Sequence, residues 1–363
     1  MRFIYIIMLA IASINCHAQL NSALTINGQI SGLKNGDSIY LVNTKDTLGV
    51  TVSKSGKFII KSTEPFKKGI YFIWLGDKSR EENIKERRYL TLYIDKPFLN
   101  ITGNVSSWPI AKVIGSESNT LMKSHDNVFN AFTKRYNTAR INKDTDRMKK
   151  IADSMINTRR SFIEANLSIH YAGYLLLKTK EFDADEKERY YKRFSKEIQN
   201  SELGAAILKD ISIIRRSKEV GIGKMAPDFR LNTPTGEQLN LYKVVNSGKL
   251  TILEFWASWC APCRKETPNV KRIYDAYKNK GLNILSVSLD KNAQKWKDAI
   301  EKDGMDWYHV SDFKYWDSEA ALIFKVNHVP QSYLLDSEGK IIAENLQGEK
   351  LRQKVEEVLG KTK

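Results

Sequence analysis

Residues 254–266 read EFWASWCAPCRKE and place Cys260 and Cys263 three positions apart, at a boundary between two sequence patterns. Before the cysteines, Thr251–Trp256 is bulky and mostly apolar, which is typical of a buried strand. After them, apolar residues recur at helical spacing over residues 262–278. The segment therefore predicts a strand, a turn that carries the thiols, and a helix.

The boundary between strand and helix is a reactive place for a thiol. A cysteine just before a helix lies where unpaired backbone N–H groups and the positive end of the helix dipole stabilise a thiolate. The thiolate is the nucleophile, and a second thiol one turn further on can resolve a mixed disulfide. Pro262 suits the first helical turn, where its missing N–H costs little. Spacing and physical chemistry together predict a redox site at Cys260 and Cys263.

Two other uses of the cysteine pair fit the sequence less well. A structural zinc ion needs two further soft ligands. The third cysteine of the chain is Cys16, near the N-terminus, and the five histidines show no metal-ligand spacing. A permanent structural disulfide would close too short a loop to remove much entropy from the unfolded chain. We therefore expect no metal site and no cofactor.

The residues that match a known pattern lie in the last part of the chain. They are Ala226–Phe229, Phe255–Cys263, and Val329 with Pro330 before the strand 332–335. This pattern resembles the thioredoxin superfamily and, in its fuller form, the TlpA-like thiol–disulfide oxidoreductases of bacterial envelopes. The resemblance covers residues 222–363 and implies an α/β thioredoxin fold for them.

The resemblance also implies roles for individual residues. Cys260 would be the nucleophile and Cys263 the resolving thiol, so that the two form a redox-active disulfide. Pro330 would carry a cis peptide bond opposite the cysteines and leave backbone groups of Val329 free to pair with an extended substrate. Trp259 would offer a flat surface to the substrate.

Two acids are candidate bases for Cys263. Glu254 falls where thioredoxins keep a buried acid, and Glu266 falls where several TlpA-like reductases carry a glutamate on the active-site helix. A carboxyl buried near a thiol has a raised pKa and can act as a general base. The lysine that accompanies the buried acid in thioredoxins is replaced by Ser286. The sequence does not decide between the two acids, and an exposed helix position explains Glu266 equally well.

The resemblance favours an exported reductase of protein disulfides, recharged by an electron donor of the cell envelope. Its substrates would be disulfide-bearing proteins. An oxidant or isomerase role is the first alternative. A thiol peroxidase is a weaker alternative. Peroxidases need the pattern Pro-x-x-x-Thr/Ser-x-x-Cys, and this chain has Leu253 in place of the Pro and Ala257 in place of the Thr or Ser.

Length and composition indicate a globular protein of two or more domains. The chain has 363 residues, too many for one ordinary domain, with 42% hydrophobic and 28% charged residues. Its net charge of +16 could suit nucleic acid or an anionic membrane surface, but basic residues are interspersed with acidic ones and no clustered basic motif occurs. We interpret the charge as a solvated lysine-rich surface and expect no nucleic-acid partner.

The N-terminus has the pattern of an export signal. A charged start precedes the apolar run Phe3–Ile14, which is too short to span a bilayer. The small residues Cys16 and Ala18 stand at positions −3 and −1 relative to a cleavage site after Ala18. Residues 1–18 are therefore expected to be a signal peptide. The alternative is a lipid anchor on Cys16, for which Asn15 is a poor preceding residue. We favour cleavage and expect a mature chain in the periplasm or cell envelope, without a transmembrane anchor.

Residues 19–117 have the pattern of an antiparallel β domain, because short strand-like segments alternate with polar turns. They also resemble an uncharacterised β domain that often precedes TlpA-like domains. The segment Lys78–Arg88 is interpreted as a solvated hairpin loop. The predicted strands lie at residues 24–30, 38–43, 58–61, 70–75, 89–94 and 99–102.

Residues 118–220 change to helical spacing, and they include one helix that starts near Asp144 and another over residues 184–198. Gly221–Lys224 has the composition of a linker. The expected fold is therefore an α+β multidomain protein: an N-terminal antiparallel β domain, a helical middle segment and a C-terminal thioredoxin fold over residues 222–363.

Within the C-terminal domain the elements follow a β/α order. Asp290 is expected to cap the second long helix, and Gly281 to end the first. The predicted strands are 229–231, 238–240, 250–256, 282–289, 332–336 and 340–344, and the predicted helices include 264–279, 317–325 and 349–359.

Overall fold

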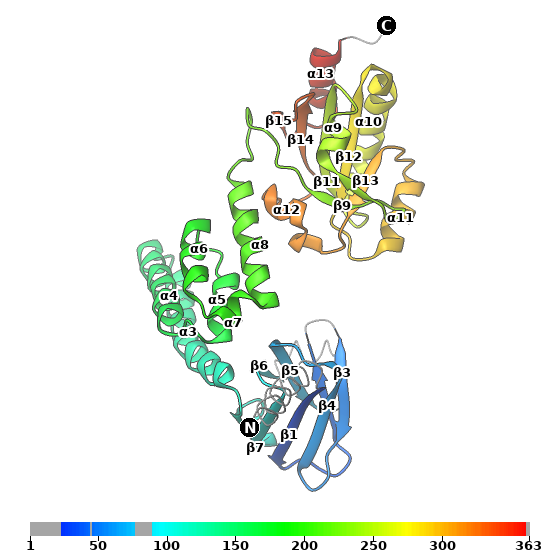
Figure 1. The fold of residues 1–363 in the computed structure, drawn as a ribbon. Coiled ribbons are helices and arrows are strands. Elements are labelled where there is room, and N and C mark those ends of the chain that lie inside the picture. Colours follow the sequence, from blue (N-terminus) through cyan, green and yellow to red (C-terminus); the bar gives the residue numbers. More distant parts are fainter. Residues whose placement is uncertain (1–22, 44–45, 77–88, 361–363) are drawn as a thin grey trace, which may run out of the picture. The chain divides into compact units, whose positions relative to one another are not determined.

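The computed structural model describes residues 23–43, 46–76 and 89–360 (Figure 1). The expected signal peptide, with its cleavage site and Cys16, and the segment Lys78–Arg88 lie outside these residues. Contacts divide the chain into two compact units. The first holds Met1–Phe182 and Glu186–Leu208, and the second holds Asp183–Asp185 and Lys209–Lys363. Each unit is described by itself.

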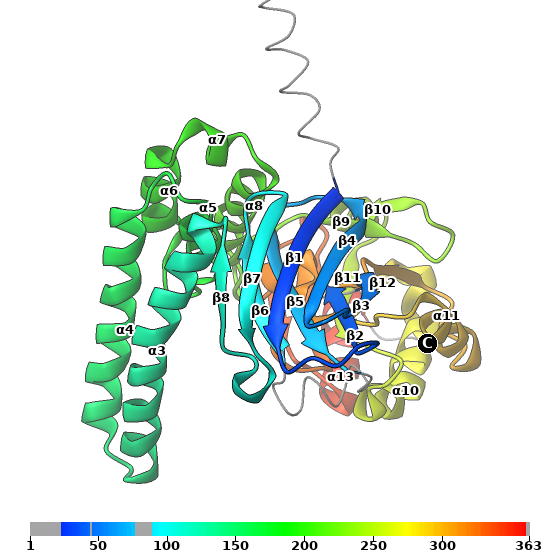
Figure 2. The ribbon, with the colours of Figure 1, turned by 90° about the horizontal axis from the view of Figure 1, so that it is seen from below.

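Two four-stranded sheets form the β-rich part of the first unit. The first has the strand order β4-β1-β7-β8 and the second β3-β2-β5-β6. Buried and exposed residues alternate along strands such as β4, so that the apolar faces of the two sheets share one core. Figure 2 shows β1, β4 and β7 side by side. The strands are β1 Ala23–Ser31, β2 Ser38–Val42, β3 Thr47–Val52, β4 Lys57–Pro65, β5 Gly69–Leu75, β6 Tyr89–Ile94, β7 Phe98–Asn104 and β8 Ala111–Ile114.

The β-rich part differs from the sequence prediction in its pairing and in two strands. β1 and β7 pair in parallel, so the domain is not purely antiparallel. The sequence pattern predicts neither β3 nor β8. β3 contains Gly49, which reads as a turn residue but lies so close to β4 that a Cβ would be 2.4 Å from the carbonyl oxygen of Lys61. β8 has four residues, too few to show a period.

Helices form the rest of the first unit. The helix expected to start near Asp144 begins at Thr145, and the Asp144 side chain caps it by accepting from the Arg147 amide at 3.0 Å. The single helix expected over residues 184–198 is divided in two, because Ser195 caps a separate turn of helix. The helices are α3 Glu117–Ile141, α4 Thr145–Ala165, α5 His170–Lys178, α6 Ala184–Arg193, α7 Lys196–Gln199 and α8 Glu202–Ser217, of which α8 continues into the second unit.

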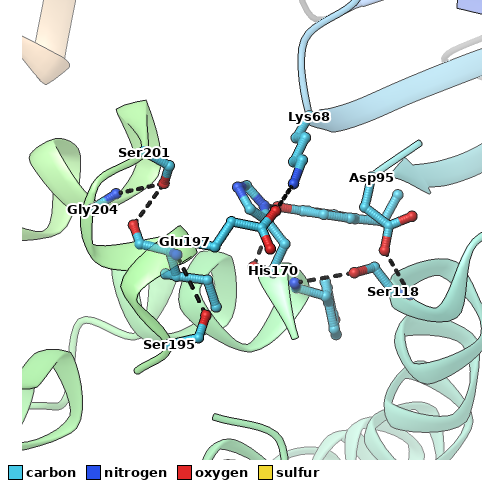
Figure 3. Close-up of polar contacts among 11 residues, drawn as sticks. Lys68, Asp95, Ser118, His170, Ser195, Glu197, Ser201 and Gly204 are labelled. Carbon is cyan, nitrogen blue, oxygen red and sulfur yellow. Dashed lines mark hydrogen bonds and ion pairs between the residues drawn. The ribbon is translucent and has the colours of Figure 1, made fainter. Parts of the chain in front are cut away.

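A polar junction joins these helices to the sheets (Figure 3). The Tyr93 hydroxyl lies 2.7 Å from His170 Nδ1, and Ser116 Oγ donates to the Tyr93 carbonyl at 2.9 Å. Lys68, between β4 and β5, forms an ion pair with Glu197 on α7. Burial lowers the pKa of His170 to about 4, so this imidazole is neutral at pH 7. The β-rich segment and the middle helices therefore make one unit.

The second unit is built on a seven-stranded sheet with the order β10-β9-β13-β12-β11-β14-β15. Strand β11 is parallel to β12 and antiparallel to β14, which gives the thioredoxin-like arrangement that the sequence predicts. The strands are β9 Arg230–Asn232, β10 Gln238–Asn240, β11 Leu250–Trp256, β12 Leu282–Ser288, β13 Tyr308–Ser311, β14 Gln331–Asp336 and β15 Ile341–Glu344. The helices are α9 Leu241–Val245, α10 Ala261–Tyr277, α11 Ala293–Lys302, α12 Glu319–Ile323 and α13 Gly348–Leu359.

Most elements of the second unit lie close to their predicted places. β11 coincides with the predicted strand, and Gly281 follows α10 and a short 3-10 turn with the left-handed φ of 99°. The cap predicted for α11 was wrong, because Asn292 and not Asp290 accepts from the amide of Lys295. Asp290 binds the turn before Cys260 instead.

The expected linker Gly221–Lys224 is partly built into the sheet. The Gly223 amide donates to the Ile341 carbonyl at 2.7 Å, and the Ile341 amide donates to the Lys224 carbonyl at 2.8 Å. The Ala226 amide donates to the Gly339 carbonyl at 2.8 Å. Residues 223–226 therefore pair with the start of β15 as a short additional edge, which the glycine-rich sequence does not reveal.

Candidate redox site

The cysteines follow the end of a buried strand of the sheet. β11 ends at Trp256, a short turn follows, and Cys260 is the N-cap of α10. The sulfur of Cys260 accepts from the Cys263 amide at 3.2 Å and is joined to the sulfur of Cys263 in a disulfide. The exposed fractions of the two residues are 3% and 6%. After reduction, the N-terminus of a 17-residue helix would stabilise a thiolate at Cys260.

The turn before Cys260 is held by the carboxylate of Asp290, the residue expected from the sequence to cap α11. Asp290 is buried and accepts from the Ser258 amide at 2.8 Å and from the Ser258 hydroxyl at 2.6 Å. It also accepts from the Ser288 hydroxyl at 2.7 Å. Three donors to one buried carboxylate fix the backbone two residues before the cysteine. A contact between residues 32 positions apart leaves no local signal in the sequence.

We expect Asp290→Ala to lower the free energy of unfolding of the second unit by about 3 kcal/mol, because it leaves two donors of half-buried Ser258 and one of buried Ser288 without their acceptor. Urea unfolding followed by tryptophan fluorescence measures this loss. The matched control is Asp298→Ala on α11, an exposed acid whose loss should change stability by less than about 0.5 kcal/mol. A loss below about 1 kcal/mol in Asp290→Ala would contradict the assigned role.

Glu254 lies on β11 and is half-buried. It stands opposite Ser286 of β12, whose hydroxyl donates to its carboxylate. Ser286 Oγ in turn accepts from the indole Nε1 of Trp307 at 2.7 Å. Burial raises the pKa of Glu254 to about 7, the hydrogen bond from Ser286 opposes the rise, and the negative charge of Glu266 adds to it. Near pH 7 this carboxyl can therefore either hold or accept a proton.

Glu266 is also half-buried, but its carboxylate has partners of its own. Its Oε1 accepts from the Gly348 amide at 2.7 Å and from the Asn269 side chain at 2.8 Å. Gly348 is the first residue of α13, so Glu266 connects α10 to the start of α13. The sequence suggests a base or an exposed residue here, and the structure adds this connecting role.

The substrate-contact candidates lie beside the same turn. The Val329–Pro330 peptide bond is cis, as the resemblance implies, and both residues are half-buried. β14 starts at Gln331, which pairs with Phe255 of β11, so Pro330 lies across from the end of the strand that leads to the cysteines. Trp259 is 48% exposed. The sheet therefore brings all three candidates to one end of β11.

Two aromatic residues near the site were not predicted. The ring centroids of Tyr315 and Trp316 lie 5.5 Å and 6.4 Å from that of Trp259. Both residues lie between β13 and α12. Tyr315 is 56 residues further along the chain than Trp259. In the sequence, the only local indication of this contact is that two aromatic residues are adjacent in a loop. That pattern does not indicate that they pack against Trp259. Within the described residues no group of His, Cys, Asp and Glu side chains could hold a metal ion.

Comparisons with known proteins agree with this geometry. The AhpC/TSA family matches residues 222–344, and a domain of unknown function, DUF4369, matches residues 24–122. The thiol-disulfide oxidoreductase ResA of Bacillus thuringiensis subsp. konkukian is 31% identical over 146 residues, which are 40% of this chain and 81% of that protein. The sporulation thiol-disulfide oxidoreductase A of Bacillus subtilis is 33% identical over 116 residues, which are 31% of this chain and 67% of that protein.

Solved structures of similar chains cover the same part. A thiol-disulfide oxidoreductase from Bacteroides fragilis has 38% sequence identity and covers 37% of this chain and 98% of its own, with a TM-score of 0.35. The thioredoxin domain of a thiol-disulfide oxidoreductase from Bacteroides vulgatus has 34% identity and covers 39% of this chain and 99% of its own, with a TM-score of 0.36.

Proposed function

The chain belongs to the thioredoxin-like thiol–disulfide oxidoreductases, and from this membership we propose that it reduces disulfides of exported proteins. The observation that carries the proposal is the disulfide between Cys260 and Cys263, with Cys260 at the N-terminus of α10. A pair so placed can pass between dithiol and disulfide without rearrangement of the strand or helix that hold it.

The reaction consists of two exchanges. The Cys260 thiolate attacks one sulfur of the substrate disulfide, forms a mixed disulfide and releases one substrate thiolate. The Cys263 thiolate then attacks the Cys260 sulfur, which breaks the mixed disulfide, releases the second substrate thiolate and forms the Cys260–Cys263 disulfide. Two electrons pass from the enzyme dithiol to the substrate. No cofactor takes part, and a dithiol donor of the cell envelope restores the reduced enzyme.

The second exchange requires that Cys263 lose its proton. We assign this proton to Glu254, because a carboxyl with a pKa near 7 can accept it at neutral pH. The hydrogen-bond chain from Trp307 through Ser286 fixes the Glu254 carboxylate on the strand that leads to the cysteines. Glu266 is the second candidate, although two donors already occupy one of its oxygens.

The place of action in this proposal is the periplasm or cell envelope. It rests on the apolar N-terminal run and cleavage after Ala18, with lipidation of Cys16 as the alternative. Among the helices of the described residues, none combines the length and apolar character that crossing a bilayer requires. Disulfides form and persist in such compartments, so substrates for a reductase are present there.

We also propose the division of the chain into a signal peptide (1–18), a β-rich part (19–117), a helical part (118–220) and a redox domain (222–363). The redox domain alone carries the cysteines of the site. We propose that the β-rich and helical parts act as a binding module that captures or orients substrates for the redox domain.

The reduction potential of the 260–263 pair tests the proposed direction. The TlpA-like pattern around the cysteines favours a reductase over an oxidant. We therefore expect a potential below about −200 mV, in the range of reductants. Titration of the full-length mature protein in thiol–disulfide buffers, read by alkylation of free thiols, measures it. A value near about −120 mV would instead indicate an oxidant.

A further inference from the structure

Trp259 is a large apolar residue exposed at the entrance to the redox disulfide. Its exposed fraction is 48%, whereas Cys260, the next residue, is 3% exposed. A substrate disulfide that reaches the Cys260 sulfur therefore passes close to the Trp259 indole. Large exposed apolar side chains beside a reactive group commonly mark a contact surface for a ligand or partner.

Trp259 does not stand alone. Its ring centroid lies 5.5 Å from that of Tyr315 and 6.4 Å from that of Trp316, and the latter two lie 5.4 Å apart. The interplanar angles range from 50° to 68°, so the rings touch at their edges and do not cover one another's faces. We call Trp259, Tyr315 and Trp316 the three-ring platform.

The loop that carries Tyr315 and Trp316 is held in one conformation. Phe313 and Tyr315 have φ values of 55° and 59°, in the left-handed region that residues other than glycine rarely adopt. The Asp312 carboxylate accepts from the Lys314 and Glu319 amides, both at 3.2 Å. Such strain persists only where the surrounding structure imposes it, and it is concentrated at functional sites.

The fixed loop has a consequence for binding. The ring of Phe313 packs on that of Trp296, with centroids 5.5 Å apart, so the loop is attached to α11 by its side chains as well. A platform ordered in advance loses little conformational entropy when a ligand binds, and more of the contact free energy then appears as affinity.

The charge at the edge of the platform limits the ligands that suit it. The Lys291 ammonium lies 4.7 Å from the centroid of the Tyr315 ring and already uses one face of it. A cationic side chain could also stack on an aromatic ring, but the charge of Lys291 repels a second cation there. A neutral aromatic side chain fits best, because it can pack against exposed Trp259 and the edges of the half-buried rings of Tyr315 and Trp316 without this repulsion.

From this arrangement we propose that the three-ring platform selects polypeptide substrates that carry an aromatic residue beside the reacting cysteine. The inference rests on the proposed exchange reaction at Cys260. It adds Tyr315 and Trp316 as specificity-determining residues, and it names the substrate class as protein disulfides flanked by Phe, Tyr or Trp rather than by small or basic residues.

The test compares three peptides of one length, each with a single cysteine in a mixed disulfide with 2-mercaptoethanol. The residue next to the cysteine is Phe, Ala or Arg. The reduced full-length mature protein is mixed with each peptide, and the second-order rate constant of reduction is measured by mass spectrometry. Each protein's rate constant for a peptide is divided by its rate constant for bis(2-hydroxyethyl) disulfide. This small disulfide has no aromatic ring and no peptide, so the division corrects for changes in cysteine reactivity.

We expect the wild-type protein to prefer the Phe peptide to the Ala peptide about tenfold, and to reduce the Arg peptide no faster than the Ala peptide. Tyr315→Ala and Trp316→Ala should lower the Phe-to-Ala ratio to about threefold or less. Trp316→Phe, which keeps a ring, should retain most of the preference. The control Tyr308→Ala removes a ring that is 41% exposed at the other end of β13, and it should leave the ratio at the wild-type value.

The possible failures are distinct. A wild-type ratio below about twofold, or a full ratio in Trp316→Ala, would overturn the platform while the exchange reaction stands. An Arg peptide reduced as fast as the Phe peptide would also overturn it, because any stacking side chain would then be accepted. If the reduced protein fails to react even with bis(2-hydroxyethyl) disulfide, the proposed exchange reaction itself is wrong.

Discussion

Replacing Cys263 with Ser is expected to abolish turnover and to leave Cys260 covalently joined to its substrate. The first exchange needs only the Cys260 thiolate, but release of the substrate needs the second thiol. Steady-state reduction of a protein disulfide should fall by more than about 10³-fold, because a general thiol from solution replaces an intramolecular one. The adduct is measured by mass spectrometry of the variant after incubation with an oxidised peptide.

Cys260→Ser is the matched control, since it removes the other sulfur of the same disulfide. It should lose activity equally and form no adduct, because Cys263 lies one turn inside α10 and lacks the N-cap position. Suppose that Cys260→Ser forms an adduct on Cys263 as abundant as the adduct on Cys260 in Cys263→Ser. The roles assigned to the two cysteines would then be reversed.

Glu254→Gln is expected to slow resolution of the mixed disulfide by about 10²-fold at pH 7.5, the usual contribution of a general base. In the wild-type protein the Glu254 carboxylate forms as the pH rises through about 7, so the resolution rate should rise across the same range. The variant should lack that rise. Single-turnover release of a labelled peptide from the mixed disulfide, between pH 5.5 and 8.5, gives both profiles.

The same pKa predicts how stability depends on pH. Because the folded-state pKa of Glu254 lies above its ordinary value of 4.5, the folded protein binds this proton more tightly than the unfolded chain. The contribution is present in full below about pH 4.5 and is lost as the pH rises through about 7. Glu254→Gln, which has no such proton, should therefore gain stability relative to wild type as the pH rises.

Glu266→Gln provides the comparison that decides between the two acids. The amide oxygen of Gln can still accept from Gly348, so the connection to α13 is kept. If Glu254 is the base, this variant should resolve the mixed disulfide within about threefold of wild type. Its pH profile should move to lower pH, because the charge of Glu266 contributes to the raised pKa of Glu254. A 10²-fold loss in Glu266→Gln with none in Glu254→Gln would identify Glu266 as the base.

The features of this protein that could be predicted from the sequence are those determined by residues within one short segment of the chain. The apolar run before the cysteines fixes β11, and the glycine at 281 ends the segment that follows α10. The cis peptide bond at Pro330 came from the family pattern and is present in the structure. The place of Ser286 opposite Glu254 also follows from the fold, because β11 and β12 are adjacent parallel strands.

The parts that could not be predicted depend on pairings between distant residues. Asp290 has the spacing of a helix cap, and only the tertiary structure shows that its carboxylate binds the Ser258 turn instead. The Trp307 indole donates to Ser286, and Ser286 donates to Glu254. The periodicity of the sequence does not indicate such hydrogen bonds between distant side chains. The parallel pairing of β1 with β7 is likewise a long-range choice that local patterns leave open.

The pairing of residues 223–226 with β15 also bears on where the redox domain can be cut. β15 is the last strand of the seven-stranded sheet, and this short segment pairs with its first residues. A shortened protein that begins after Ala226 would present those backbone groups to other molecules, as an open template for strand addition and aggregation. Residues 223–226 therefore also protect the exposed margin of the catalytic sheet from self-association.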